Sequence, residues 1–188
     1  MVANECGLID RIALIEVPIP GSGPHPELNR ATPIAKLPTL ITGDGLVVAG
    51  SQVVCEYLND LGGGGLIPAT GTARWRALSR QAMADGMLDM LLLWRADLRR
   101  SEPCRSPGQQ AEYLRRLHAT LDRFEQEAPA RTGFDIGDIA TGILLSYLDF
   151  RFPTLEWRTD RPALRQTHAA FEARPSASAT AFFAPADR

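Results

Sequence analysis

The chain has 188 residues, of which 45% are hydrophobic, so it is long enough for one domain or two small ones with an apolar core. Its formal net charge of −2 and pI of about 5.9 provide no basic surface for nucleic acid. Its longest apolar run is far below the roughly 18 residues of a membrane span, and the first residues lack a signal-peptide pattern. We therefore expect a cytoplasmic protein that binds neither nucleic acid nor membrane.

The three cysteines, Cys6, Cys55 and Cys104, lie far apart in the sequence. None belongs to a C-x-x-C motif or to a Cys/His cluster, so the sequence indicates neither a disulfide framework nor a metal site. Cys6 falls at the predicted end of a short helix at residues 2–6. We interpret it as a structural cysteine.

Residues 12–19 form an apolar run that predicts a β-strand, although prolines interrupt its end. The connection that follows, at residues 24–34, is rich in Pro, Gly and Asn. It is predicted to hold at most a short helical turn.

The clearest local pattern lies at residues 36–61. Two apolar, β-branched runs at residues 39–42 and 46–49 flank a glycine-containing turn and predict a β-hairpin. Directly afterwards, Ser51 is expected to be the N-cap of a helix that ends at the four glycines of residues 62–65.

Two details of this stretch point to a ligand. Pro38 restricts Leu37 to extended geometry, and a cis bond there would leave neighbouring backbone groups available to an extended ligand. The Ser51 hydroxyl and the first N–H groups of its helix would form an anion site. Together they predict a site for a small peptide carboxylate. An ordinary loop proline and an ordinary N-cap are the alternative interpretation.

From residue 69 onward the sequence predicts helices alone. Apolar residues at spacings of three and four predict a long helix at residues 73–100 with Thr72 as its cap, and a second helix at residues 109–127. Asp135 and Asp138 occupy the N-cap and third helical positions before an almost wholly apolar helix at residues 139–150, which should be buried. A further helix is expected from residues 160–162 to residue 174.

Residues 36–61 resemble the second half of the thioredoxin-like domain of glutathione transferases. In that family a Val/Leu-Pro step with a cis proline precedes a strand, and a Glu/Asp-Ser pair opens the next helix. Here these positions read Leu37-Pro38 and Gly50-Ser51, so the serine matches and the acidic residue does not. The YLDFR motif that starts at Tyr147 resembles small bacterial members of the same family.

The resemblance implies a fold of two parts: an α/β thioredoxin-like domain at residues 1–64 and an all-α helical bundle at residues 73–188. The first strand, the loop after it and most of the first helix of the family have no counterpart ahead of the segment VANECGLIDRI. We expect either a truncated product or a start codon further upstream. Because that loop carries the family's catalytic residue, the catalytic residue here is unknown.

The resemblance also implies a function: conjugation of the thiolate of glutathione, the co-substrate, to small hydrophobic electrophiles, in detoxification and as a homodimer. The backbone of Leu37, beside Pro38 and Gly50, would pair with the cysteinyl part of glutathione. Ser51 would bind the γ-glutamyl carboxylate, and Lys36 could reach the glycyl carboxylate.

Leu91 and Trp94, on the long helix, are candidate walls of a pocket for the electrophile, with core packing as the alternative. Two other functions stay open. The protein could be a catalytically impaired binding protein on the same fold, which Gly50 and the missing loop favour. It could also be a glutathione-dependent thiol reductase, which would need a cysteine in that loop.

Overall fold

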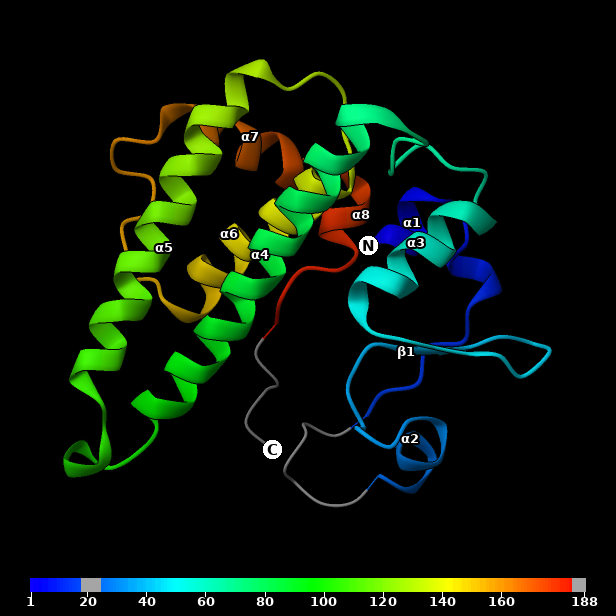
Figure 1. Ribbon diagram of the computed structural model, residues 1–188, viewed down its shortest axis with the longest axis horizontal. Coiled ribbons are helices and arrows are strands. Elements are labelled where there is room, and N and C mark those ends of the chain that lie inside the picture. The colour runs from blue at the N-terminus through cyan, green and yellow to red at the C-terminus, as the bar shows by residue number, and fades with distance from the viewer. Residues whose placement is uncertain (18–24, 184–188) are drawn as a thin grey trace. The chain divides into compact units, whose positions relative to one another are not determined.

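The computed structural model describes residues 1–17 and 25–183 (Figure 1). The chain forms two compact units. One is Val2–Ala69, and the other is Thr70–Arg188 together with Met1. Among the described residues, no helix has both the length and the apolar character needed to cross a membrane.

The unit Val2–Ala69 is a small α/β structure. Its elements are α1 (Val2–Glu5), the 3-10 turn η1 (Ile9–Arg11), α2 (Pro26–Ala31), β1 (Thr39–Ile41), β2 (Val47–Ala49) and α3 (Ser51–Leu61). The strands β1 and β2 pair antiparallel, with Leu40 opposite Val48. The predicted hairpin is confirmed, and each strand is one residue shorter than expected.

The hairpin turn is closed by its own residues. Thr42 N–H donates to the Leu46 carbonyl at 2.9 Å, and Leu46 N–H donates to the Thr42 hydroxyl at 2.9 Å. The hydroxyl of Thr42 donates in turn to the carboxylate of Asp44, and Gly45 adopts a φ of 87° that favours glycine. The turn therefore rests on local sequence, which is why it was predictable.

The strand predicted at residues 12–19 is wrong over its described part, because residues 12–17 are irregular. In the described part of the chain, the sheet holds only β1 and β2, so this segment has no strand to pair with. A strand with neither neighbour leaves a row of backbone donors and acceptors without partners. Residues 18 and 19 lie outside the described residues.

The core of this unit is small. Val48 of β2 and Val54 and Leu58 of α3 are buried. Asn59 extends it, because its buried side-chain oxygen accepts the N–H groups of Leu66 and Ile67 at 3.0 and 3.1 Å. That pair of hydrogen bonds fixes the chain as it leaves α3.

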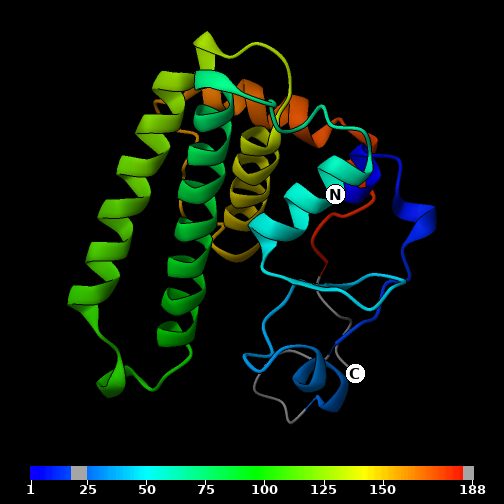
Figure 2. The same cartoon turned by 45° about the vertical axis from the view of Figure 1, so that its right-hand side comes forward.

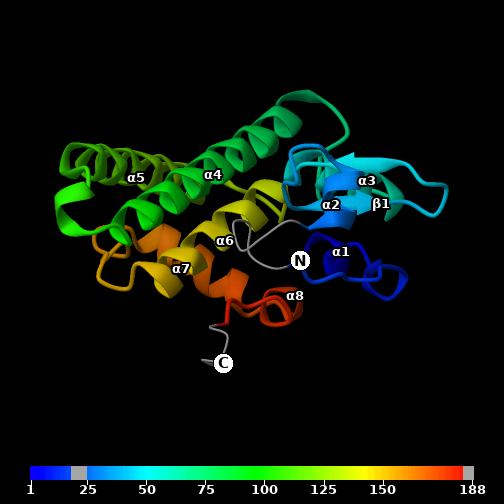
Figure 3. The same cartoon turned by 90° about the horizontal axis from the view of Figure 1, so that it is seen from below.

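The second unit is all helical. Its elements are α4 (Gly71–Leu98), the 3-10 turn η2 (Glu102–Cys104), α5 (Pro107–Glu127), the 3-10 turn η3 (Ala128–Ala130), α6 (Ile136–Arg151), α7 (Pro162–Glu172) and α8 (Pro175–Ser178). Helices α4, α5 and α6 run side by side (Figure 2), and α6 lies between α4 and α7 (Figure 3). As predicted, α6 is the buried central helix.

The core of the helical unit is built around α6. Leu144, Leu145 and Leu148 are fully buried, and they belong to one apolar cluster with Leu121 of α5 and Leu164 of α7. Burying one such side chain stabilises the fold by roughly 1.5–3 kcal/mol relative to leaving it exposed.

The start of α6 is fixed by a capping box. The Asp135 carboxylate accepts the N–H groups of Gly137 and Asp138 at 2.8 and 3.2 Å, and the Asp138 carboxylate accepts the Asp135 N–H at 3.0 Å. Arg80 pairs with Asp135, and Arg131 Nη1 lies 2.9 Å from Asp138 Oδ1. Both acidic residues are therefore structural, as predicted.

The other helix ends depart slightly from expectation. Helix α4 begins at Gly71, with Thr70 in the N-cap position, so the prediction of Thr72 as its cap is wrong. The extended backbone of Thr70 makes the transition into the helix before Thr72 is reached. Helix α5 begins at Pro107 rather than residue 109, because proline fits the first helical turn.

Candidate functional site

The segment before β1 and the start of α3 are joined within the unit Val2–Ala69. The peptide bond between Leu37 and Pro38 is cis, which confirms the geometry considered from the sequence. The Gly50 N–H donates to the Pro38 carbonyl at 3.1 Å. The Thr39 hydroxyl donates to the Lys36 carbonyl at 2.8 Å. These hydrogen bonds hold residues 36–38 beside the first turn of α3.

Gly50, and not Ser51, is the N-cap of α3, so the prediction of Ser51 as the cap is wrong. Gly50 has a φ of 93° and a ψ of 139°, and its carbonyl accepts the Val54 N–H at 2.9 Å. The glycine backbone can adopt this positive φ at little cost. Gly50 therefore serves as the N-cap, and Ser51 is the first residue of the helix. Ser51 is exposed and lies at the positive end of the helix dipole.

This corner of the unit presents groups that suit a small anionic peptide. Leu37 is 41% exposed, and Lys36 and Ser51 are exposed as well. The first N–H groups of a helix lack acceptors inside the helix, and they favour a carboxylate or phosphate. A lysine nearby adds a positive charge. The arrangement can therefore bind an extended ligand through its backbone and a carboxylate through the helix end.

The two residues predicted to line a pocket for the electrophile belong to the helical unit and lie in its core. Leu91 is 0% exposed and Trp94 is 8% exposed. The centroids of the Trp94 and Phe152 rings lie 5.1 Å apart. Both side chains are therefore packed in the core of the helical unit. Their contact with a substrate stays a prediction.

All three cysteines are free thiols. Burial, and to a smaller extent the charge of Glu5, raises the pKa of the Cys6 thiol. A raised pKa disfavours the nucleophilic thiolate, in line with a structural role for this residue.

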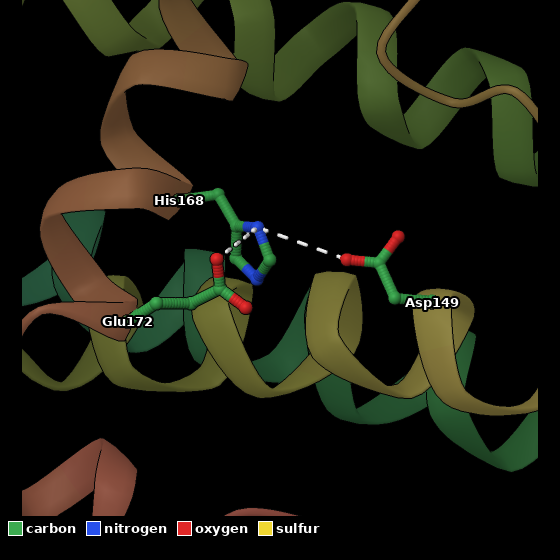
Figure 4. Close-up of side chains that lie close together, drawn as sticks. All are labelled: Asp149, His168 and Glu172. Carbon is green, nitrogen blue, oxygen red and sulfur yellow. Dashed lines mark ion pairs between the residues drawn. The ribbon is translucent and has the colours of Figure 1, made fainter.

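A cluster of ionisable side chains that the sequence analysis did not single out lies between α6 and α7. His168 Nδ1 is 3.9 Å from Asp149 Oδ2 and 3.7 Å from Glu172 Oε2 (Figure 4). The only sequence signal was the i,i+4 spacing of His168 and Glu172, which places both on one helix face.

An arginine already pairs with the aspartate of this cluster and contacts its histidine. Arg158 donates to the two oxygens of Asp149 at 2.6 and 2.7 Å, and its Nη2 lies 3.4 Å from His168 Nδ1. The Ser146 hydroxyl lies 3.0 Å from His168 Nε2. Because the guanidinium sits where a metal ion would need the same oxygens, we interpret the cluster as an ion-pair network that fastens α7 to α6.

The pKa values in the cluster follow from this packing. Burial lowers the pKa of His168, and the carboxylates of Glu172 and Asp149 only partly oppose it. Burial alone would raise the pKa of Asp149, but hydrogen bonds from Arg158 and Trp157 outweigh it and lower the pKa. The network thus holds an ionised aspartate beside a neutral histidine.

Comparison with known protein families gives matches in both units. The family model described as the N-terminal domain of glutathione S-transferase matches residues 1–61, and the one described as the C-terminal domain matches residues 107–166. A curated relative, the uncharacterized GST-like protein YibF of Escherichia coli K12, is 25% identical over 137 residues, which are 70% of this chain and 68% of that protein.

Solved structures give broader matches. A glutathione transferase family member from Pseudomonas fluorescens Pf-5, solved with bound glutathione, is 34% identical with a TM-score of 0.88, covering 96% of this chain and 90% of that chain. A glutathione S-transferase from Methylobacillus flagellatus KT with glutathione bound is 30% identical with a TM-score of 0.83, again covering 96% and 90%. Both units therefore have solved counterparts with the same fold.

Proposed function

The chain belongs to the glutathione transferase family and has its fold, a thioredoxin-like α/β unit followed by an all-helical unit; on this premise we propose that it conjugates glutathione to small hydrophobic electrophiles. The observation that carries the proposal is the hydrogen bond of 3.1 Å from Gly50 N–H to the Pro38 carbonyl. It holds the exposed backbone near Leu37 beside the start of α3. Glutathione is bound in the relatives from P. fluorescens and M. flagellatus.

Each part of glutathione finds a chemical counterpart in this corner. The backbone of Leu37, ahead of the cis bond to Pro38, pairs with the cysteinyl residue. The Ser51 hydroxyl and the first turn of α3 bind the γ-glutamyl carboxylate, where the helix dipole contributes about 0.3–1 kcal/mol. Lys36 attracts the glycyl carboxylate.

The proposed reaction begins with transfer of the thiol proton of bound glutathione to solvent water. The resulting thiolate attacks an electrophilic carbon, so that a C–S bond forms while the leaving group departs with the electron pair. Positive charge near the ligand, from Lys36 and the N-terminal end of α3, favours the thiolate form of bound glutathione. The electrophile requires an apolar pocket; Leu91 and Trp94, which the sequence suggested for it, are 0% and 8% exposed and lie in the core of the helical unit, so neither is assigned to a wall of that pocket.

Glutathione binding without conjugation is the second candidate function. It is favoured by Gly50, which offers a ligand no side-chain carboxylate. A homodimeric state, a cytoplasmic location and a role in detoxification belong to the main proposal.

Calorimetric titration of the full chain with glutathione tests the binding site. Replacing Ser51→Ala removes one hydrogen bond to a charged group and should weaken binding about tenfold. Ser106→Ala is the matched control, because Ser106 is an exposed serine at the start of α5 whose side chain makes no capping hydrogen bond. This control should leave the affinity unchanged.

Conjugation is assayed separately with 1-chloro-2,4-dinitrobenzene, whose thioether product absorbs in the near ultraviolet. Binding with turnover supports the main proposal, and binding without turnover with this or other electrophiles supports the second candidate. Failure to bind glutathione would contradict both. Equal affinities for wild type and Ser51→Ala would contradict the role given to Ser51.

A further inference from the structure

A cleft of about 530 Å³ lies in the helical unit, between α6 and α7. One face of each helix lines it at helical spacing, with Asp138, Thr141 and Leu145 on α6 and Ala163, Thr167 and Ala170 on α7. Ala128 and Pro129 of η3 and the residues Arg131, Gly133 and Phe134 after it also line the cleft. The volume lies within the range of roughly 300–1,000 Å³ found for small-molecule sites.

Small side chains contribute to the lining of the cleft from both helices. At Gly142 the two helices touch, since a Cβ built there would lie 2.2–2.5 Å from ring atoms of Phe171. Gly142 and Phe171 both line the cleft, as do the short side chains of Ala163 and Ala170, which occupy little of its space. Apolar walls come from Leu145, Phe171 and Phe134.

Two buried polar atoms in the cleft make no hydrogen bond within the described part of the chain, Arg131 Nη1 and Thr141 Oγ1, but Arg131 Nη1 has the Asp138 carboxylate at 2.9 Å, which leaves Thr141 as the neutral group without a partner. Thr141 is 1% exposed, and its hydroxyl has no hydrogen-bond partner among the described residues. A threonine inside a helix ordinarily bonds the carbonyl four residues earlier, and a buried hydroxyl without any bond is costly. An acceptor placed in the cleft beside Thr141 would satisfy this hydroxyl.

The charged groups around the cleft are already matched. Arg131 lies 2.9 Å from Asp138 and donates to the Thr167 hydroxyl at 3.0 Å. The guanidinium of Arg174 stacks over the Phe134 ring at 3.7 Å. Both ring nitrogens of His168 face groups on its other side, Ser146 and Arg158. A charged ligand would lose its hydration here without gaining an uncompensated counter-charge.

We propose that this cleft binds a small uncharged molecule with an apolar, ring-sized body and one carbonyl oxygen, which accepts a hydrogen bond from the Thr141 hydroxyl. The site is separate from the residues proposed to bind glutathione, all of which belong to Val2–Ala69. The proposal therefore does not depend on transferase activity.

The test uses acetophenone as the probe and ethylbenzene as the probe without the carbonyl. Each is titrated into the ¹⁵N-labelled full chain, and dissociation constants are taken from amide shifts of Gly133, Thr141 and Thr167. Acetophenone should bind about three- to tenfold more tightly than ethylbenzene. In Thr141→Val, which keeps the shape and removes the hydroxyl, this preference should disappear while ethylbenzene binds as before.

A second pair of variants locates the site. Ala170→Leu fills the cleft and should abolish the shifts caused by both probes. Ala169→Leu is the matched control, because Ala169 is an exposed neighbour on α7 that does not line the cleft. It should bind both probes like wild type. No shift at these amides in wild type, binding that survives Ala170→Leu, or a preference that survives Thr141→Val would each overturn the proposal.

Discussion

The two units of the chain are stabilised in different ways. In the helical unit, α6 buries Leu144 and Leu148 completely against its neighbours. In Val2–Ala69 the hairpin and α3 leave large apolar side chains in contact with solvent, with Ile41 57%, Leu46 54% and Val53 57% exposed. Helix α4 also exposes Trp75, Leu92 and Leu93, so the difference lies in the size of the buried core: the helical unit has an extensive apolar cluster around α6, and the α/β unit has a small one.

The polar side chains of the two units also differ in their surroundings. In the helical unit, acidic groups such as Asp138 and Asp149 are held by arginines and by backbone N–H groups. In the α/β unit, Lys36 and Ser51 are exposed beside a helix end. The paired acidic residues of the helical unit stabilise its fold, whereas a binding role for Lys36 and Ser51 is part of the proposed function.

The largest effect is expected from breaking the capping network of the helical unit. Asp138→Ala removes the acceptor of the Asp135 N–H and the partner of Arg131, which is itself largely buried. Leaving one partner of a buried ion pair alone costs about 3–5 kcal/mol. Urea denaturation followed by circular dichroism should show a loss of this size in the free energy of unfolding.

Glu112→Ala is the control for that experiment. Glu112 pairs with Arg115 and Arg116 at the surface of α5, and these bonds lower the pKa of its carboxyl to about 2. Exposed pairs contribute little, so the denaturation midpoint should not move measurably. Equal midpoints for Asp138→Ala and wild type would contradict the structural role of Asp138.

Much of the fold followed from the sequence because its signals are local. The capping residues Asp135 and Asp138 lie three positions apart and marked the start of α6 correctly. The strand at residues 12–19 failed for the opposite reason. Strand propensity is a local property, but a strand forms only where another strand supplies its hydrogen bonds. The sequence of the segment alone does not show whether such a partner is present.

The candidate site was predictable only through resemblance to a family. From the residues alone, Pro38 could equally be an ordinary loop proline and Ser51 an ordinary N-cap. Serine is a preferred N-cap residue, so the sequence favoured Ser51 over Gly50, whose capping position depends on a positive φ. Leu91 and Trp94 show a further limit, because helical periodicity marks an apolar face without telling a core from a pocket wall. Contacts between helices, such as Asp149 with His168, leave no local pattern.

A smaller effect is expected from Gly50→Ala in the α/β unit. A Cβ at this position meets nothing within 4 Å, so the cost comes from the backbone conformation alone, a φ of 93° with a ψ of 139° that favours glycine, at about 1–3 kcal/mol. Hydrogen exchange of the α3 amides should accelerate accordingly, while those of α6 should not change.

Gly43→Ala is the matched control, since Gly43 also has open space around it and lies outside the left-handed region. It should leave exchange in α3 as in wild type. If Gly50→Ala behaves like this control, the start of α3 is not held by the conformation of residue 50.

The smallest effect is a dependence of stability on pH that belongs to the helical unit. His168 is 1% exposed and faces Asp149 and Ser146 from α6, Arg158 from the connection after it, and Glu172 from its own helix. Burial lowers its pKa in the folded protein, so below about pH 6.5 the unfolded chain takes up a proton that the folded chain does not. The free energy of unfolding should therefore fall as the pH decreases from about 6.5 towards the folded pKa, and then level off with respect to this group.

Urea denaturation at closely spaced pH values measures the slope. In His168→Gln, which keeps a polar side chain near Ser146, the slope in this window should be reduced relative to wild type even if the variant is less stable at every pH. Parallel curves for the two proteins would mean that His168 binds its proton equally well folded and unfolded, and that the buried network does not exclude the charge.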